Sequence, residues 1–387
     1  SSTGPSVNLG FEPQFVMIKS ASGSEAWYVY DSMRGMVVGG DDAELAWNLT
    51  TAENGILGTS KAILDLTPTG FNITNNSSTV NTSSHKYIYM AIRRGGMQTP
   101  TVGTDVFAAD LGDASSVPQF VSNFPVDMAM LRDINNSDTM SIGSRLQGTK
   151  RLYISNSAEQ TNSYYEWDYN NGYFSTALNT DYFSWMWKRA RGYFDAVTYT
   201  GTGSARTVSH NLGVVPEMMW LKRRNATGDW AVYHASQGNA KAAKLNSSVA
   251  FSAEAYFNST TPTSSVFSLA DFNDSGQPYI AYLFATVAGV SKVGSYTGNG
   301  STQTIDCGFT SGARLVLIKK ASDTGHWRMI DTTRGLVAGN DKTVLLNQTN
   351  AQATDEDTVD PDDSGFALPN NADVNNSGDT FIFYAIA

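Results

Sequence analysis

The chain is poor in cysteine, in charge and in long apolar runs. Cys307 is the only cysteine among 387 residues, which excludes an internal disulfide and a thiolate metal cluster. Charged residues make up 16%, with 36 acidic against 26 basic side chains and a formal net charge of −10. Phosphate backbones are bound by clustered Lys and Arg, so nucleic acid is not expected as a partner. Apolar runs such as 15–18 and 315–318 are far shorter than the roughly 20 residues that span a bilayer, so no membrane insertion is expected.

The sequence contains several internal repeats, and these repeats indicate the type of fold. Residues 8–30 align without a gap with 211–233, and residues 19–38 align with 319–338. A tryptophan recurs at one aligned position, as Trp27, Trp230 and Trp327. Each of these three units also closes with a hydrophobic segment, at 87–92, 279–284 and 381–386. The chain is therefore expected to consist of repeated structural units.

Residues 95–190 form a more divergent unit that keeps the same closing pattern. Its last hydrophobic segment, 182–187, runs into Lys188-Arg189 as 87–92 runs into Arg93-Arg94. We predict four units, at 1–94, 95–190, 191–287 and 288–387. Units three and four open with the phrases YTGTG (199–203) and YTGNG (296–300), which unit one lacks. The chain is therefore expected to begin inside a repeat and to belong to a longer polypeptide.

The local pattern within each unit is that of β-structure. Short runs of Val, Ile, Phe, Tyr and Trp are broken by turns rich in Gly, Asn, Ser and Asp. Runs such as 16–18, 218–221 and 316–318 are continuously apolar, which is typical of strands buried on both faces or central to a sandwich. No segment has a sustained helical period. The prediction is an all-β chain of tandem antiparallel β-sandwich repeats, jelly-roll-like in character.

The repeated phrases also carry a resemblance to a known family. The segment HNLGVVPEMMWLKRR (210–224), followed by WAVYH (230–234) and YIAYLF (279–284), resembles a repeat of bacteriophage virion proteins. YTGNGSTQTI (296–305) does so too, as does MAIRR (90–94) leading to GTDVF (103–107). The family is that of tail-fibre and other tail-associated proteins, which often also carry concanavalin- or laminin-G-like sandwiches. The resemblance covers nearly the whole chain and is closest in units one, three and four.

The resemblance implies a protein on the virion exterior, in the tail or another appendage. Its implied partners are other virion proteins, further copies of itself, with a trimer the commonest form, and a host cell-surface glycan. The family supplies no catalytic residue. Unit two departs most from the shared pattern and is rich in aromatics at 164–169 and 182–187. Because aromatic residues are enriched at the centres of subunit interfaces, we expect unit two to contribute disproportionately to contacts between subunits or with another virion protein.

Three acidic segments are candidate metal sites. Residues 271–276 and 373–378 match the start of an EF-hand loop, but the twelfth position is Tyr282 or Tyr384 instead of Glu. Both are interpreted as Asn/Gly β-turns. The run 355–363 holds six carboxylates and is the better Ca²⁺ candidate, although a solvated acidic loop is favoured. No histidine has a short metal-ligand spacing, and no metal or cofactor is predicted.

Aromatic residues supply the candidate binding site. The recurring Trp27, Trp230 and Trp327 are interpreted as sandwich core residues in preference to sugar-stacking residues. The candidate surface-binding residues lie outside the shared pattern and alternate with polar residues; they are Tyr164, Tyr165, Trp167 and Tyr169. Packing against a neighbouring subunit explains them equally well. In the turns 31–35 and 331–335, the Asp and Arg are expected to pair.

No catalytic constellation is evident. The chain has no Gly-x-Ser-x-Gly elbow, and no carboxylate pair stands out as a glycosidase acid and base. Copying one unit several times favours a spacer or a multivalent binder, since avidity rises with the number of copies. The prediction is a non-enzymatic virion structural protein with a role in host attachment. The alternatives are a polysaccharide depolymerase tailspike and a cellular surface adhesin or lectin.

Overall fold

The computed structural model describes residues 4–53, 62–75, 77, 79–154, 161–162, 165–175 and 181–387. Nearly all regular structure in these residues is short antiparallel strands, and their one α-helix is α1 (Ala372–Asn375). Three 3₁₀ turns occur at η1 (Gly103–Asp105), η2 (Arg145–Gln147) and η3 (Ala235–Gln237). The all-β prediction is confirmed. No helix in the described part of the chain is long and apolar enough to cross a bilayer.

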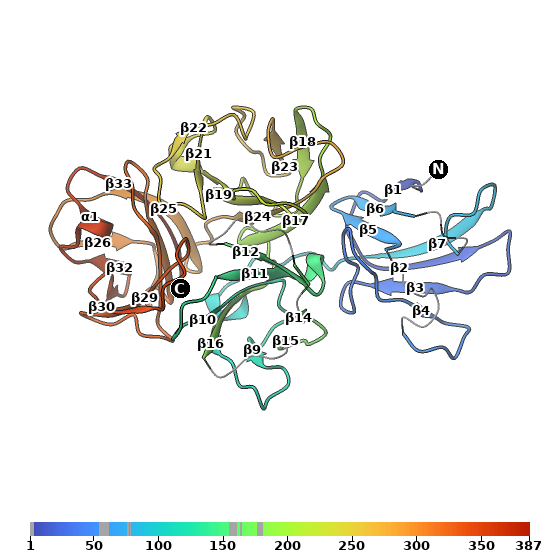
Figure 1. Ribbon diagram of the computed structural model, residues 1–387, viewed down its shortest axis with the longest axis horizontal. Helices are drawn as coiled ribbons and strands as arrows, with labels where there is room; N and C mark the ends of the chain where they lie inside the picture. Colours follow the sequence, from blue (N-terminus) through green and yellow to red (C-terminus); the bar gives the residue numbers. More distant parts are fainter. Residues whose placement is uncertain are drawn as a thin grey trace.

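Every sheet draws its strands from one of the four predicted units (Figure 1). The strands of unit one are β1 (Ser6–Asn8), β2 (Pro13–Ser20), β3 (Tyr28–Asp31), β4 (Leu45–Ala46), β5 (Leu64–Thr67), β6 (Gly70–Ile73) and β7 (Tyr87–Arg93). Those of unit two are β8 (Phe107–Leu111), β9 (Phe120–Val121), β10 (Met128–Asp133), β11 (Ser141–Ser144), β12 (Lys150–Tyr153), β13 (Thr161–Asn162), β14 (Tyr165–Glu166), β15 (Gly172–Ser175) and β16 (Tyr182–Trp187).

Units three and four share most of their strands, but unit four has one additional strand and contains α1, whereas unit three contains η3. The strands of unit three are β17 (Phe194–Thr200), β18 (Arg206–Ser209), β19 (Met218–Arg223), β20 (Ala231–His234), β21 (Lys241–Lys244), β22 (Ser252–Ala253), β23 (Val266–Leu269) and β24 (Pro278–Phe284). Those of unit four are β25 (Ser291–Thr297), β26 (Gln303–Asp306), β27 (Leu315–Lys320), β28 (Trp327–Asp331), β29 (Asp341–Leu345), β30 (Ala353–Glu356), β31 (Asp360–Asp362), β32 (Gly365–Leu368) and β33 (Thr380–Ile386).

Each unit packs a large sheet against a small one. In units two, three and four the large sheet has one strand order, β8-β16-β10-β11-β12-β13, β17-β24-β19-β20-β21-β22 and β25-β33-β27-β28-β29-β30. In unit one it is β7-β2-β3-β4, so the strand that opens the other units has no counterpart among the described residues. The closing strand β7 is therefore an edge strand, whereas β16, β24 and β33 are each flanked by two strands.

The continuous apolar runs serve two cores at once. Successive side chains of a strand point to opposite faces of the sheet. In β24, Ala281 and Leu283 face the core of unit three, which lies between its two sheets. Tyr282 and Phe284 point outward and are nevertheless fully buried, because they belong to a second hydrophobic core. A strand buried on both faces needs no polar alternation, which explains the runs.

The second core is shared by units two, three and four. It contains large outward-facing side chains of all three units, among them Trp185, Trp220, Tyr282, Trp327 and Tyr384. Figure 1 shows the three units grouped around this point, with unit one to their side. The shared core makes units two to four a single rigid body, which we call the ring.

Three matching hydrogen bonds run around the ring. Trp327 Nε1 of unit four donates to Lys244 O of unit three at 3.0 Å. Trp230 Nε1 of unit three donates to Tyr153 O of unit two at 2.9 Å. At the third interface Met140 stands in place of the tryptophan, and Leu345 O of unit four accepts instead from Arg132 Nη1 of unit two, at 3.0 Å. The accepting carbonyl thus occupies the same place in all three interfaces, the donor is a tryptophan in two of them, and the cycle closes after three.

Unit one is attached to the side of the ring through a buried ion-pair network. Arg189, which follows the closing strand of unit two, donates two hydrogen bonds of 2.8 Å to Glu12 of unit one. Its Nε donates to Asp195 Oδ1 of unit three at 2.6 Å. Arg94 Nη2 of unit one lies 3.3 Å from Asp127 of unit two. One buried guanidinium therefore joins three units.

Candidate functional site between units one and two

A cleft of about 910 Å³ lies between units one and two. One wall is the segment of unit one between β3 and Ala43, and the other contains η2, β14 and the residues that follow β14. The predicted binding residues Tyr165 and Trp167 are among its lining residues. Its charged lining residues are Arg34, Asp41, Asp42, Glu53, Arg145, Lys150, Glu166 and Asp168.

The aromatic residues of the candidate site are mostly internal. Tyr165 is 1% exposed and Trp167 is 4% exposed, and their rings stack with a centroid distance of 5.5 Å. Trp167 Nε1 donates to Gly148 O at 2.8 Å. Burial raises the pKa of Tyr165 to about 12. The expected surface position of these two rings is corrected: they fill the core between the two sheets of unit two and offer no open face for a ligand.

The other two predicted residues differ from these. Tyr169 is half-buried, and its hydroxyl donates to Glu166 Oε2 at 3.4 Å. Tyr164 lies outside the described residues. The alternation in 165–168 does reflect extended backbone, since β14 pairs with β15 through Tyr165 and Ser175. The alternation predicts that the strand has two faces, but not which face packs against the core. In the structure, the face that carries the aromatic side chains packs against the core.

Carboxylates and guanidinium groups dominate the open part of the cleft. Burial raises the pKa of Asp168, and the negative charges of Glu53 and Glu166 act in the same direction against the nearby Arg145. Arg34 Nε lies 2.5 Å from Asp31 Oδ2, and its Nη1 lies 3.3 Å from Glu53 Oε2. The predicted Asp–Arg turn pair is confirmed here and in unit four, where Arg334 Nε lies 2.6 Å from Asp331 Oδ2.

Asp42 lines the cleft but has a structural role. Its carboxylate accepts backbone N–H bonds from Val37, Ile63 and Leu64 at 2.8–2.9 Å. Asp341 accepts three backbone N–H bonds at the corresponding place in unit four. Burial raises the pKa of Asp42 to about 8 and that of Asp341 to about 6, while these N–H groups act in the opposite direction. These two carboxylates therefore organise the same loop in units one and four.

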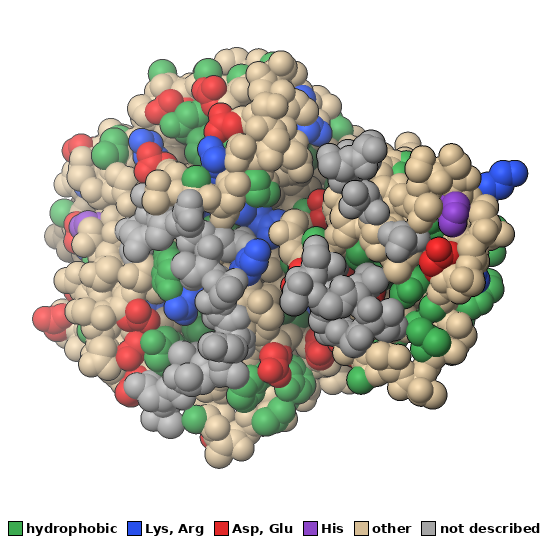
Figure 2. All heavy atoms as spheres, turned by 45° about the vertical axis from the view of Figure 1, so that its right-hand side comes forward, with side chains coloured by type: hydrophobic (Ala, Val, Ile, Leu, Met, Phe, Trp, Pro, Cys, Tyr) green, Lys and Arg blue, Asp and Glu red, His purple; other side chains and the backbone are tan. Residues whose placement is uncertain are grey.

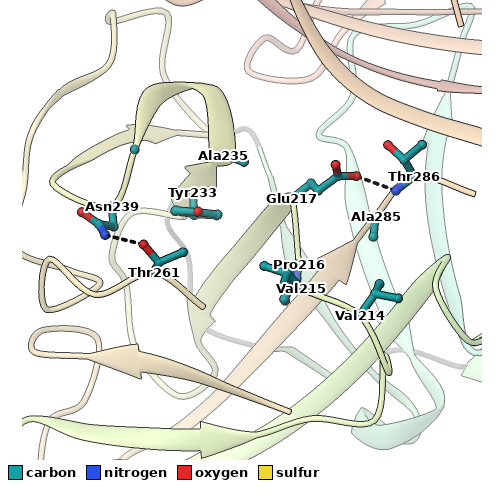
Figure 3. A pocket seen from close by; sticks show the side chains of 11 residues that line it. Val214, Val215, Pro216, Glu217, Tyr233, Ala235, Asn239, Thr261, Ala285 and Thr286 are labelled. Atoms are coloured by element: carbon teal, nitrogen blue, oxygen red, sulfur yellow. Dashed lines mark hydrogen bonds between the residues drawn. The ribbon is translucent and has the colours of Figure 1, made fainter. Parts of the chain in front are cut away.

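A second cavity of about 490 Å³ lies in unit three (Figure 3). Val214, Val215 and Pro216 form one side of it. The carboxylate of Glu217 is turned toward the backbone of Thr286, whose N–H donates to it at 2.6 Å (Figure 3). Among the described residues that line this cavity, Glu217 is the only carboxylate, so they provide no acid and base pair.

The first EF-hand-like segment forms bends and a turn, whereas the second begins within α1 and ends in a turn at 377–378. Asn273 Oδ1 accepts from Thr202 N, and Asn375 Oδ1 accepts from Asn299 N, both at 3.0 Å. Each asparagine thus fixes the glycine turn that follows the opening strand of its unit. A Cβ on Gly201 would lie 2.1 Å from Asp274 O, so only glycine fits that turn. The Asn/Gly turn interpretation is confirmed for 271–276 but is wrong for 373–375, which lie in α1 behind the N-cap Asn371.

The acidic run 355–363 is spread over several elements. Glu356 in β30 forms an ion pair with Arg328. Asp360 Oδ1 in β31 accepts from Gly339 N at 3.0 Å, and Asp362 Oδ1 accepts from Ser364 N at 2.9 Å. Within the described residues, no group of three or more His, Cys, Asp or Glu side chains is arranged to hold a metal ion.

The recurring tryptophans are not all in the expected place. Trp230 and Trp327 are buried, but in the core between units and not inside their own sandwiches. Trp27 is only half-buried. Sequence reasoning therefore missed the outer faces of the large sheets as contact surfaces. The available signal was the continuous apolar run, which one sandwich core alone does not require.

The fold and the cleft define a class of protein: tandem β-sandwiches, three of them fused into one body. A family model described as a domain of unknown function, DUF7483, matches residues 1–94 and 121–387. The chain belongs to the DUF7483 family. Comparison with curated proteins found no match, and comparison with solved structures found none.

Proposed function

We propose that this protein is a non-enzymatic structural component of a bacteriophage exterior, a tail fibre or another appendage, that takes part in attachment to a host glycan. The observation that carries the proposal is the ring. Three sandwiches share one hydrophobic core, so the chain uses its repeats to build a stiff body. Repeated scaffolding of this kind suits a spacer that presents surfaces, and the resemblance to tail-associated repeats supports the virion assignment.

The cleft between units one and two is the proposed glycan contact. Polyhydroxylated ligands are held by convergent carboxylates and hydrogen-bond donors in a concave site. Glu53, Glu166 and Asp168 provide acceptors there, and Arg34 and Lys150 provide donors. The aromatic rings beneath them are buried, so the proposed recognition is polar and relies little on ring stacking.

Two experiments test the proposal. Antibodies raised against the chain should label the exterior of particles of a phage that encodes it, and cryo-EM of those particles should place it in an appendage. Labelling confined to host cells would favour a cellular adhesin.

For the glycan contact, the purified chain is applied to an array of bacterial surface polysaccharides. The double variant Glu166→Gln with Asp168→Asn should lose binding. The control Asp323→Asn, at an exposed acidic residue of unit four, should retain it. Release of reducing ends from a bound polysaccharide would overturn the non-enzymatic assignment and favour a depolymerase.

A further inference from the structure

The outer face of the large sheet of unit one is apolar and uncovered. Ile88, Met90 and Ile92 alternate along β7 on this face and are 52%, 42% and 46% exposed. Trp47, which follows β4, is 62% exposed. Figure 2 shows hydrophobic side chains gathered over unit one, on the right-hand side of that view. Large exposed apolar patches on soluble proteins mark interaction sites.

Exposed large hydrophobic residues are concentrated in unit one. Of the 15 in the described chain, seven belong to this unit, and the remainder are valines except for Leu111. Trp47 and Tyr89 are the exposed aromatic residues of that set. Isolated valines on a surface are ordinary, whereas tryptophan, isoleucine and methionine side by side are not. This distribution singles out unit one, and Ile88, Met90 and Ile92 lie on the outer face of its large sheet.

Strand register identifies the counterparts of this face in the ring. Met17 pairs with Met90 in unit one, as Trp220 pairs with Tyr282 in unit three and Leu317 with Tyr384 in unit four. The counterparts of Ile88, Met90 and Ile92 are all buried in the shared core; they are Phe183, Trp185 and Trp187 in unit two, Ile280, Tyr282 and Phe284 in unit three, and Ile382, Tyr384 and Ile386 in unit four.

The tryptophan contacts are equivalent as well. The backbone N–H of Trp27 donates to Asn48 Oδ1 at 2.9 Å, as those of Trp230 and Trp327 donate to Asn246 and Asn347. Trp47 N donates to Trp27 O in the way that Leu245 N and Leu346 N donate to the other two tryptophans. Leu245 and Leu346 lie in the shared core, whereas Trp47 is exposed.

The same register locates the acceptor edge of unit one. In units three and four, the residue after the tryptophan pairs with Lys244 or Leu345, whose carbonyl accepts from the neighbouring unit. In unit one, Tyr28 pairs with Ala46 in the same position. Unit one therefore carries both halves of the ring contact, a donor at Trp27 and an acceptor at Ala46.

We propose that this face docks against the same face in two further copies of the chain, so that three unit ones close a ring of the kind formed by units two to four. The contact joins the donor side of one copy to the acceptor side of the next, so it is heterologous, and a heterologous contact forms a ring when its rotation closes. The ring within the chain demonstrates closure after three. Trp27 Nε1 of one copy then donates to Ala46 O of the next. The inference does not depend on the proposed virion role.

The test is the molar mass of the full chain in solution. Light scattering at micromolar concentration should give three times 41.8 kDa for the wild-type chain. Met90→Glu and, separately, Ile88→Glu place a charge on the docking face and should give the monomer mass. Both positions are exposed within one chain, so each variant should keep the near-UV circular dichroism of a folded monomer.

The matched control is Val249→Glu, an exposed apolar residue of unit three, which should remain trimeric. A wild-type monomer at every soluble concentration would overturn the proposal and would leave the edge of β7 as a site for strand addition. A dimer would overturn it too, because a two-fold pair does not reproduce the ring. A trimer that persists in both β7 variants would show that another surface assembles the protein.

Discussion

Arg189 holds Glu12 with two hydrogen bonds of 2.8 Å, and in this way the end of unit two is fixed to the beginning of unit one. Both side chains are buried, and Asp195 of unit three completes the cluster. Arg94 adds a second guanidinium 3.6 Å from Glu12 Oε1, and Asn211 Nδ2 donates to Glu12 Oε2 at 3.1 Å. A small number of buried polar groups thus determines how unit one sits on the ring.

Removing one partner of this network should loosen unit one. Glu12→Gln leaves Arg189 with less compensating charge in a buried site, and breaking a buried pair costs about 3–5 kcal/mol. We expect a lower free energy of unfolding by roughly that amount, and faster proteolysis between units one and two. The control Arg223→Gln breaks the exposed pair with Asp274, where a change of at most ~1 kcal/mol is expected. Equal effects of the two variants would contradict the structural role of Glu12.

The same carboxylate predicts a dependence on pH. Burial raises the pKa of Glu12, but Arg189 more than offsets this, with Arg94 and Asn211, and the net pKa is lowered from 4.5 to about 2. The folded pKa is below the unfolded value, so Glu12 stabilises the fold above about pH 4.5 and loses this contribution as the pH falls toward 2. The stability difference between wild type and Glu12→Gln should therefore shrink from pH 6 to pH 3. Thermal unfolding across this range measures it; a difference independent of pH would refute the assignment.

The tryptophan contacts of the ring predict unequal effects of one substitution. Trp230→Phe removes the partly buried hydrogen bond to Tyr153 O, which contributes about 0.5–1.5 kcal/mol, in addition to the packing of the larger ring. Trp27→Phe, measured at a concentration low enough to keep the chain monomeric, should change the free energy of unfolding by at most ~0.5 kcal/mol. Urea unfolding followed by circular dichroism compares them. A large effect of Trp27→Phe in the monomer would mean that its ring is already engaged within the chain.

The repeated units and their β-structure could be predicted from the sequence, because the aligned segments place equivalent residues at equivalent positions of the sheet. Residues 8–30 and 211–233 align without a gap, and Met17 and Trp220 indeed occupy one sheet position. What the outer face of each large sheet packs against could not be predicted. The hydrophobic pattern around a residue such as Tyr282 is the same whether its side chain packs within its own unit or against the next unit. The burial of Tyr165 and Trp167 was missed for a related reason, since alternation does not show which side faces the core.

Calcium should contribute little to stability. The carboxylates of the acidic run that have described partners are already engaged, Glu356 with Arg328 and Asp360 with the backbone of Gly339. A cation that binds only the folded state would stabilise it by an amount that grows with its concentration relative to the dissociation constant. We therefore expect the melting temperature to be the same, within about 1 °C, in EDTA and in millimolar Ca²⁺. A rise in Ca²⁺ that disappears in Asp357→Asn with Asp363→Asn would instead establish 355–363 as a calcium site, and the absence of a rise in Mg²⁺ would show that the site selects the larger ion.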